Sequence, residues 1–188
     1  MVDLDIINRI RTEHAQAVEG MFKNHTHDII ALAEKMASAV NANHKLLFCG
    51  NGGSACDAMH IAGEFVGRFV HDRRALPAIA LTADSGIITA VANDYSYEDI
   101  FSRQVEALGQ KGDILIAMST SGKSPNVLKA IVTAKEKNIF TILLTGEKGK
   151  DSNAADMTIA VPSMVTAHIQ EAHITLLHGL AFLVESKL

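Results

Sequence analysis

Two side chains on one predicted helix carry the first chemical signal. His60 and Glu64 are four residues apart, so on a helix they project from one face on adjacent turns. An imidazole and a carboxylate in this arrangement bind a divalent metal ion or act as an acid–base pair. Ordinary polar pairs on solvated helix faces share this spacing, so the pair alone does not decide between chemistry and solvation.

The loop before this helix favours chemistry. Residues 45–49 form a short apolar run, expected as a buried strand, which Gly50-Asn51-Gly52-Gly53-Ser54 interrupts. The glycines let the backbone take φ > 0 and approach a ligand closely. We expect Ser54 to cap a helix that continues from Ala55. The free N–H groups of this helix start would bind an anion, such as a phosphate, or a polar sugar.

A second polar loop follows the apolar run 113–118. It reads Ser119-Thr120-Ser121-Gly122-Lys123-Ser124-Pro125, with four hydroxyls and a serine N-cap before proline at the first helical position. Hydroxyl and backbone N–H groups would bind a phosphate here. The loop is not a Walker A motif, because the required first glycine is Ala117. The alternative is a capped helix start that binds nothing.

The last predicted helix, residues 167–187, contains Gln170 and His178. Along a straight helix they are about 12 Å apart. Metal–ligand bonds of about 2 Å would let both reach one ion only by stretching toward each other. Either this helix starts late or bends, or the site combines two chains. The alternatives are a core histidine and a polar residue in the first turn.

The remaining pattern predicts the elements that position these loops. Short apolar strands at 45–49, 78–81, 113–118, 140–144 and 157–161 alternate with helices that include 87–92, 97–108 and 127–137. This alternation predicts an α/β fold with a doubly wound parallel sheet of about five strands. Ligands bind such sheets outside the carboxyl ends of the strands, so both polar loops are expected to share one cleft. Asn93-Asp94 is expected in a turn after the short helix.

Two amphipathic helices, 3–24 and 27–42, precede the first strand, with Asn24-His25-Thr26 between them. Their apolar faces need a partner, which is either the sheet or another subunit. We therefore divide a single domain, 1–188, into a helical extension used in oligomerisation, 1–44, and an α/β core, 45–188. The histidines of this extension are expected at the surface and not as metal ligands: His14, His25, His27 and His44.

Composition narrows the class of protein. The 188 residues are 48 % hydrophobic and 20 % charged, which is typical of one globular domain. A net charge of −4 argues against nucleic-acid binding. Two cysteines, Cys49 and Cys56, are expected as reduced thiols of a cytoplasmic protein. The N-terminus lacks a signal-peptide pattern, and the longest apolar stretch, 174–184, is too short to span a bilayer.

Four segments together resemble one known family. They are C-G-N-G-G-S-A-C-D-A-M-H-I-A-G-E-F, V-A-N-D-Y-S, I-A-M-S-T-S-G-K-S-P-N-V and I-Q-E-A-H-I-T-L-L-H. They are similar to the signature segments of the phosphoheptose isomerase family of sugar-isomerase (SIS) domain proteins. The resemblance implies a flavodoxin-like SIS fold and an enzyme that interconverts sedoheptulose 7-phosphate and D-glycero-D-manno-heptose 7-phosphate. It also implies a role in lipopolysaccharide heptose synthesis, a homotetramer with active sites between subunits, and one zinc ion per subunit.

The resemblance also implies roles for single residues. The expected metal ligands are His60, Glu64, Gln170 and His178. Glu64 is expected to be the catalytic base and His178 the acid. The expected substrate contacts are Asn51, Gly52, Gly53, Glu64, Asn93, Asp94, Ser119, Thr120, Ser121, Ser124 and Gln170. The sequence departs from the family at Met59, where many members have glutamine, and at Cys56, where a smaller residue is usual.

Three other functions compete with this interpretation. A non-catalytic SIS module would bind a sugar phosphate or a replication-initiator protein, and it would be expected to lack the Glu64 and His178 chemistry. A nucleotide-binding Rossmann domain needs an acidic residue about 20 positions after its glycine loop, whereas the nearest at a strand end, Asp84, follows by about 30. The third is an isomerase of another sugar phosphate, or a SIS regulatory domain that senses one.

Overall fold

A computed structural model describes residues 2–188 and shows a single five-stranded sheet. Its strands are β1 (Leu46–Gly50), β2 (Ala78–Ala80), β3 (Ile114–Met118), β4 (Phe140–Gly146) and β5 (Met157–Val161). They lie in the order β2-β1-β3-β4-β5, and every neighbouring pair is parallel. The predicted doubly wound parallel sheet is confirmed. The winding direction reverses between β1 and β3, and such a switch point is where these sheets bind ligands.

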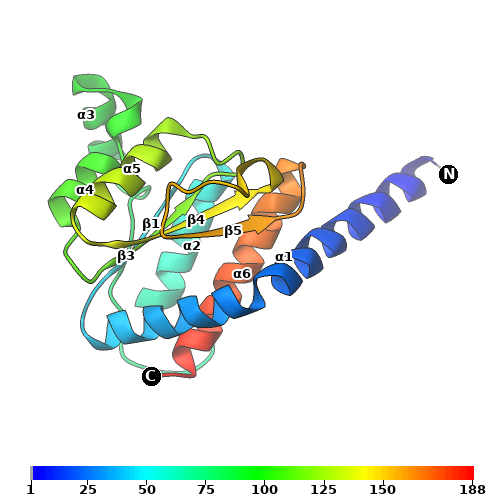
Figure 1. The fold of residues 1–188 in the computed structure, drawn as a ribbon, viewed down its shortest axis with the longest axis horizontal. Coiled ribbons are helices and arrows are strands. Elements are labelled where there is room, and N and C mark those ends of the chain that lie inside the picture. Colours follow the sequence, from blue (N-terminus) through cyan, green and yellow to red (C-terminus); the bar gives the residue numbers. More distant parts are fainter. Residues whose placement is uncertain (1) are drawn as a thin grey trace.

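Helices cover both faces of the sheet (Figure 1). They are α1 (Val2–Asn41), α2 (Gly53–Val66), α3 (Ser85–Asp94), α4 (Ser102–Leu108), α5 (Pro125–Glu136) and α6 (Thr166–Glu185), with short 3-10 helices η1 (Tyr97–Asp99) and η2 (Glu147–Gly149). Helices α1, α2 and α6 pack on one face, and α4 and α5 on the other. Within residues 2–188, no helix is long and apolar enough to cross a membrane.

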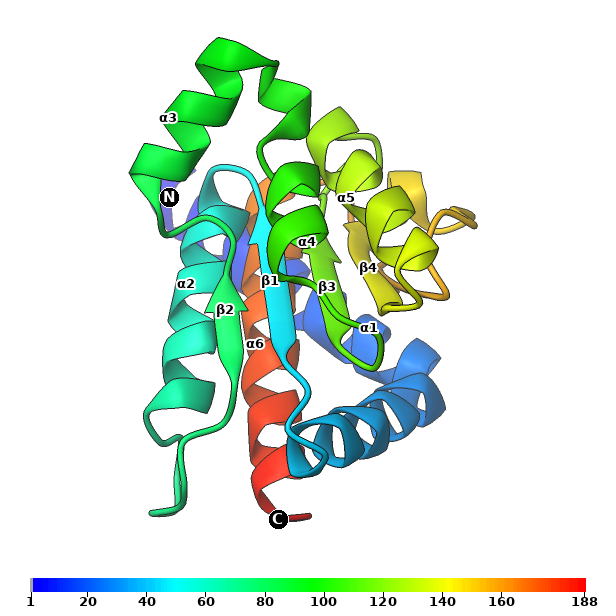
Figure 2. The same cartoon turned by 90° about the vertical axis from the view of Figure 1, so that its left-hand side faces the viewer.

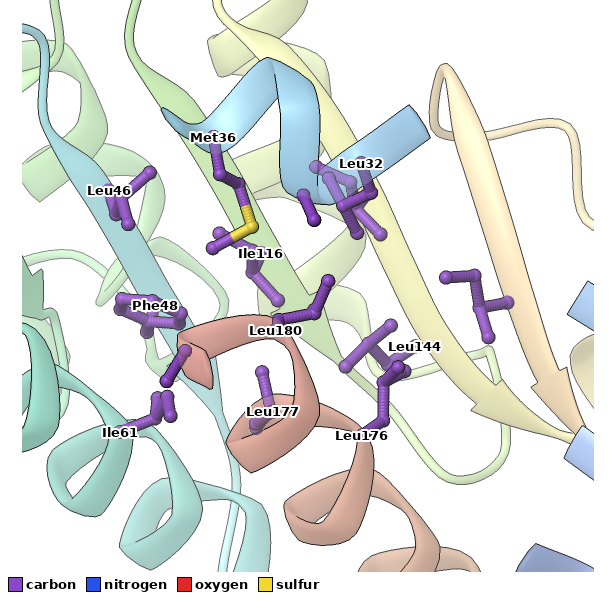
Figure 3. Close-up of a cluster of buried hydrophobic side chains, with 14 of the residues drawn as sticks. Leu32, Met36, Leu46, Phe48, Ile61, Ile116, Leu144, Leu176, Leu177 and Leu180 are labelled. Carbon is purple, nitrogen blue, oxygen red and sulfur yellow. The ribbon is translucent and has the colours of Figure 1, made fainter. Parts of the chain in front are cut away.

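Alternate strand residues supply two separate cores. Phe48, Ile116 and Leu144 pack with leucines of α6 on one face, as Figure 3 shows, whereas Leu47 and Leu143 point to α4 and α5. Because both faces are buried, the central strands read as continuous apolar runs.

The N-terminal extension differs from the prediction. The two expected helices are one run, α1, kinked at His25, whose φ of −122° and ψ of 19° are not helical. The first half of α1 projects from the body (Figure 1), with Val2, Leu4 and Ile7 more than half exposed. The expectation that His25 is a surface residue was wrong, because its Nε2 accepts a hydrogen bond from the Ala160 N–H (3.2 Å) and its ring is largely covered.

Three local predictions were also wrong. Helix α2 begins at Gly53 with Gly52 as its N-cap, so Ser54 lies buried in the first turn and does not cap it. Asn93 and Asp94 form the last turn of α3 and not a loop. The expected helix 97–108 is divided into η1 and α4, because Ser96 caps a separate 3-10 turn by accepting the Glu98 N–H.

Candidate active site

The two polar loops predicted to bind phosphate meet at the switch point. One joins β1 to α2 and the other joins β3 to α5, and β1 and β3 are adjacent in the sheet. The Asn51 and Asn126 side chains bind each other across this gap through two amide hydrogen bonds of 2.8 and 2.9 Å. The Tyr97 hydroxyl also donates to the Asn51 Oδ1 (3.1 Å). The two loops are therefore adjacent, as expected from the sequence, and their side chains are in direct contact.

Glycine is required at two positions of the first loop. Gly52 has a φ of +56°, which turns the chain directly into α2. A Cβ atom on Gly53 would lie 2.6 Å from the Gln170 side chain, so Gly53 lets α6 approach the start of α2 closely. This close approach places the Gln170 side chain at the N-terminus of α2. The Ser54 and Ala55 N–H groups there already donate to the Asn51 and Gly52 carbonyls, so the positive end of the helix dipole is what favours an anion.

Three hydroxyls of the second loop converge. The Ser119 Oγ lies 2.9 Å from the Ser124 Oγ and 3.5 Å from the Ser121 Oγ. Backbone N–H groups join them, since Ser124 N donates to the Ser119 Oγ and Lys123 N to the Ser121 Oγ. Gly122, at a φ of +69°, makes this turn possible. Thr120 instead lines a small neighbouring pocket together with Ser121 and Lys148.

A second cluster lies between α2 and α6. The His178 Nε2 is 3.0 Å from the His60 Nε2, which is 3.3 Å from the Glu64 Oε1. The ligand atoms of the three side chains all lie within 4.8 Å of one another. Tetrahedral ligands at about 2.0 Å from zinc are about 3.3 Å apart, and two histidines with a carboxylate are a common catalytic zinc set. The three residues therefore fit a zinc ion.

The pKa shifts around the cluster favour the binding of a cation. Burial and the neighbouring His60 lower the pKa of His178, and Glu64 opposes this shift. A neutral imidazole has the free lone pair that a metal needs. One turn earlier on α2, burial raises the pKa of Asp57, although His60 opposes the shift. Among the described residues, no group binds the buried Asp57 Oδ2.

The other predicted site residues lie elsewhere in this chain. Gln170 contacts Gly53, and seven residues of helix separate Gly53 from His60, or about 10 Å along α2. Asn93 and Asp94 are exposed and hydrogen-bonded to each other at the end of α3, above the carboxyl edge of the sheet (Figure 2). Met59, the departure noted from the sequence, is exposed beside the cluster.

Sequence reasoning missed three residues of this region. Asn126 and Tyr97 are hydrogen-bonded to Asn51. The sequence offered a signal for Asn126 alone, as a polar residue directly after Ser124-Pro125. Asp57 stands three residues before His60 and seven before Glu64, so helical spacing alone predicts that it shares their face.

The sheet order and the paired loops at the switch point are those of the SIS domain. A family model described as the SIS domain matches residues 11–146, so the match covers both polar loops and the helix with His60 and Glu64.

Comparison with individual proteins identifies the family within the SIS-domain proteins. The chain is 48 % identical over 186 residues to the phosphoheptose isomerase of Thermodesulfovibrio yellowstonii, covering 97 % of this chain and 92 % of the relative. Its structure is similar to phosphoheptose isomerases from Neisseria gonorrhoeae (37 % identity, TM-score 0.89, 99 % and 100 % of the two chains) and Francisella tularensis (38 %, 0.90, 99 % and 100 %). The chain belongs to the phosphoheptose isomerase family, which is a family of enzymes.

Proposed function

We propose that this enzyme interconverts sedoheptulose 7-phosphate and D-glycero-D-manno-heptose 7-phosphate, as the first step of ADP-heptose and lipopolysaccharide core synthesis in the cytoplasm. The observation that carries the proposal is the convergence of His60, Glu64 and His178 between two helices that are far apart in sequence. Chemistry of this kind separates the proposal from a non-catalytic sugar-phosphate receptor, which needs only the two polar loops.

The anchoring groups come from the two loops. The hydroxyls of Ser119, Ser121 and Ser124, with the N-terminus of α5, would hold the phosphate, and Thr120 lies beside them. Asn51 and the amides of Gly52 and Gly53 would orient the sugar chain, with Asn93, Asp94 and Gln170 as further substrate contacts.

In this proposal Glu64 and His178 transfer the protons. Glu64 takes a proton from C1 of the ketose, and the electrons of that C–H bond form the C1=C2 bond of an enediolate. His178 gives a proton to O2 and takes one from O1, and Glu64 returns its proton to C2, which completes the aldose. Each positioned acid or base contributes about 10²–10⁴-fold in rate. A zinc ion held by His60, Glu64 and His178, with Gln170 of another subunit proposed as a fourth ligand, would supply charge stabilisation at the sugar oxygens. In this proposal Glu64 alternates between the roles of ligand and base.

The distances within one chain favour an assembled site. Glu64 lies eleven residues beyond Gly53, or about 16 Å along α2, so loops and cluster are well separated in this chain. We therefore propose a homotetramer in which loops and cluster of different subunits serve one substrate. The exposed apolar residues on the projecting half of α1 suit this assembly, since unpartnered apolar surface favours association. In this proposal residues 1–44 extend a single domain.

The test follows the aldose by NMR after sedoheptulose 7-phosphate is added to purified protein. Glu64→Gln and His178→Ala are expected to lose at least about 10²-fold in turnover while the circular dichroism spectrum is kept. Removal of metal with a chelator is expected to abolish turnover, and zinc is expected to restore it. Wild-type-like turnover in both variants would reject the assigned roles, and no aldose from the metal-loaded wild type would reject the function.

A further inference from the structure

The segment between α2 and β2 is fixed to the end of α6 by one buried carboxylate. Glu185 Oε1 accepts hydrogen bonds from the Phe69 N–H (2.9 Å) and the Arg73 Nε (3.1 Å). Its Oε2 accepts the Val70 and His71 N–H groups, both at 3.1 Å. The Glu185 and Arg73 side chains are only 2 % and 9 % exposed. A carboxylate this buried and fully hydrogen-bonded holds its partners rigidly.

Arg73 extends this contact to the helix that carries Glu64. Its Nη2 donates to the Glu64 carbonyl oxygen (2.8 Å), and its Nη1 donates to the carbonyls of Phe65 (2.8 Å) and Gly67 (3.2 Å). The Glu64 and Phe65 carbonyls belong to the last turn of α2, and Gly67 is its C-cap residue; such carbonyls lack partners within the helix. A guanidinium also complements the negative end of the helix dipole. The C-terminal turns of α2 and α6, which lie at the same end of the molecule in Figure 2, are therefore joined through one ion pair.

The same segment presents an aromatic ring to the cluster. Phe69 stacks on the His178 imidazole with ring centroids 5.4 Å apart and planes 16° apart. The His60 ring is 4.9 Å from His178 at an interplanar angle of 59°. The imidazole thus has two ring neighbours, and its Nε2 is directed at the His60 Nε2 (3.0 Å).

We propose that Phe69, held by the Arg73–Glu185 ion pair, is a positioning residue that orients the His178 imidazole relative to Glu64. The inference rests on the proposed function and assigns no contact with substrate to these three residues. Glu185 fixes the backbone of Phe69, Phe69 fixes the plane of His178, and Arg73 fixes the turn of α2 that carries Glu64. Without these contacts, the His178 imidazole would rotate about its side-chain bonds. Fewer molecules would then have the imidazole and the Glu64 carboxylate in the reactive arrangement.

Supporting residues around metal-ligating side chains contribute about 10–100-fold to metal affinity or activity. Phe69→Leu keeps an apolar side chain but removes the stacked ring, so we expect about a tenfold fall in kcat with little change in KM. Binding of Co²⁺, used as a spectroscopic probe of the His60, Glu64 and His178 site, is expected to weaken by a similar factor. Phe69→Tyr keeps the ring and should restore both values.

Phe182→Leu is the matched control. Phe182 lies one turn beyond His178 on α6, and its ring faces His71 at 6.5 Å. The same substitution there should leave kcat and Co²⁺ affinity within about twofold of wild type, which is the deviation typical of two sites that act independently. A fourth variant, Glu185→Gln, removes the carboxylate charge that pairs with Arg73. It should reproduce the Phe69→Leu effects in protein that circular dichroism shows to be folded.

The outcomes separate this inference from the function it rests on. Active wild type together with a Phe69→Leu variant of unchanged kcat and Co²⁺ affinity would overturn the positioning role alone. Wild type that forms no aldose would overturn the proposed function, and the Co²⁺ affinities would then decide the positioning role. Equal losses in Phe69→Leu and Phe182→Leu would show a general packing effect and would also overturn it.

Discussion

Lowering the pH should destabilise this protein through one histidine outside the proposed chemistry. His173 on α6 is completely buried, and its Nε2 lies 3.2 Å from the Thr145 carbonyl oxygen at the end of β4. Within residues 2–188, its Nδ1 has no partner. Burial lowers the pKa of His173 from 6.5 to about 4, although the hydrogen bond to Thr145 opposes the shift.

The sign and size of the effect follow from this pKa. The folded pKa is below the unfolded one, so between pH 6.5 and about 4 the unfolded chain binds a proton that the folded protein does not. The stabilisation is complete above the unfolded pKa and is lost as the pH falls toward the folded pKa. Each pKa unit is worth about 1.4 kcal/mol, so going from about pH 7.5 to pH 5 should cost about 2 kcal/mol.

The assay is urea unfolding followed by circular dichroism at both pH values, with metal removed so that ligand binding does not contribute. His173→Gln keeps an amide donor for the Thr145 carbonyl but cannot titrate. The wild type should lose about 2 kcal/mol more than this variant between the two pH values. An equal loss in the two proteins would refute the assignment of a buried neutral imidazole.

Further predictions concern the assembly, the phosphate loop and the thiols. Mixing inactive Glu64→Gln with Ser124→Ala and letting subunits exchange should restore activity if the site combines two chains, and a mixture no better than its parents would contradict this. Ser124→Ala alone should raise KM by roughly 10–100-fold, because it loses a hydrogen bond to the charged phosphate of the substrate. The control Ser38→Ala, at an exposed serine, should leave KM unchanged. Folded protein should react with one equivalent of iodoacetamide, at exposed Cys56, because Cys49 is buried and burial raises its pKa to about 12; two equivalents without denaturant would contradict this.

The sheet was predictable because its physical cause is local. Each central strand is a short apolar run, and β1 and β3 are each followed by turn residues and a helix. This alternation predicts parallel connections, whereas the strand order comes from the structure. Helix ends were less predictable. A serine at position 54 is a good cap by type, yet the positive φ of Gly52 starts α2 two residues earlier.

The proposed site was predictable only where its members are close in sequence. The spacing on one helix predicted His60 and Glu64, and the run of hydroxyl residues predicted Ser119 to Ser124. Joining His178 to them required the family resemblance, because 114 residues separate Glu64 from His178 and no local pattern encodes that contact. Arg73 and Glu185 gave no signal at all, since a charged residue in a linker and one at a helix end both look solvated.

Hydrogen exchange at the sugar carbons tests the central claim most directly, because it follows the proton that Glu64 is assigned to move. With sedoheptulose 7-phosphate in ²H₂O, NMR should show deuterium entering C1 with the wild type and none with Glu64→Gln, even over long incubation. Exchange at C1 catalysed by Glu64→Gln at the wild-type rate would contradict the account.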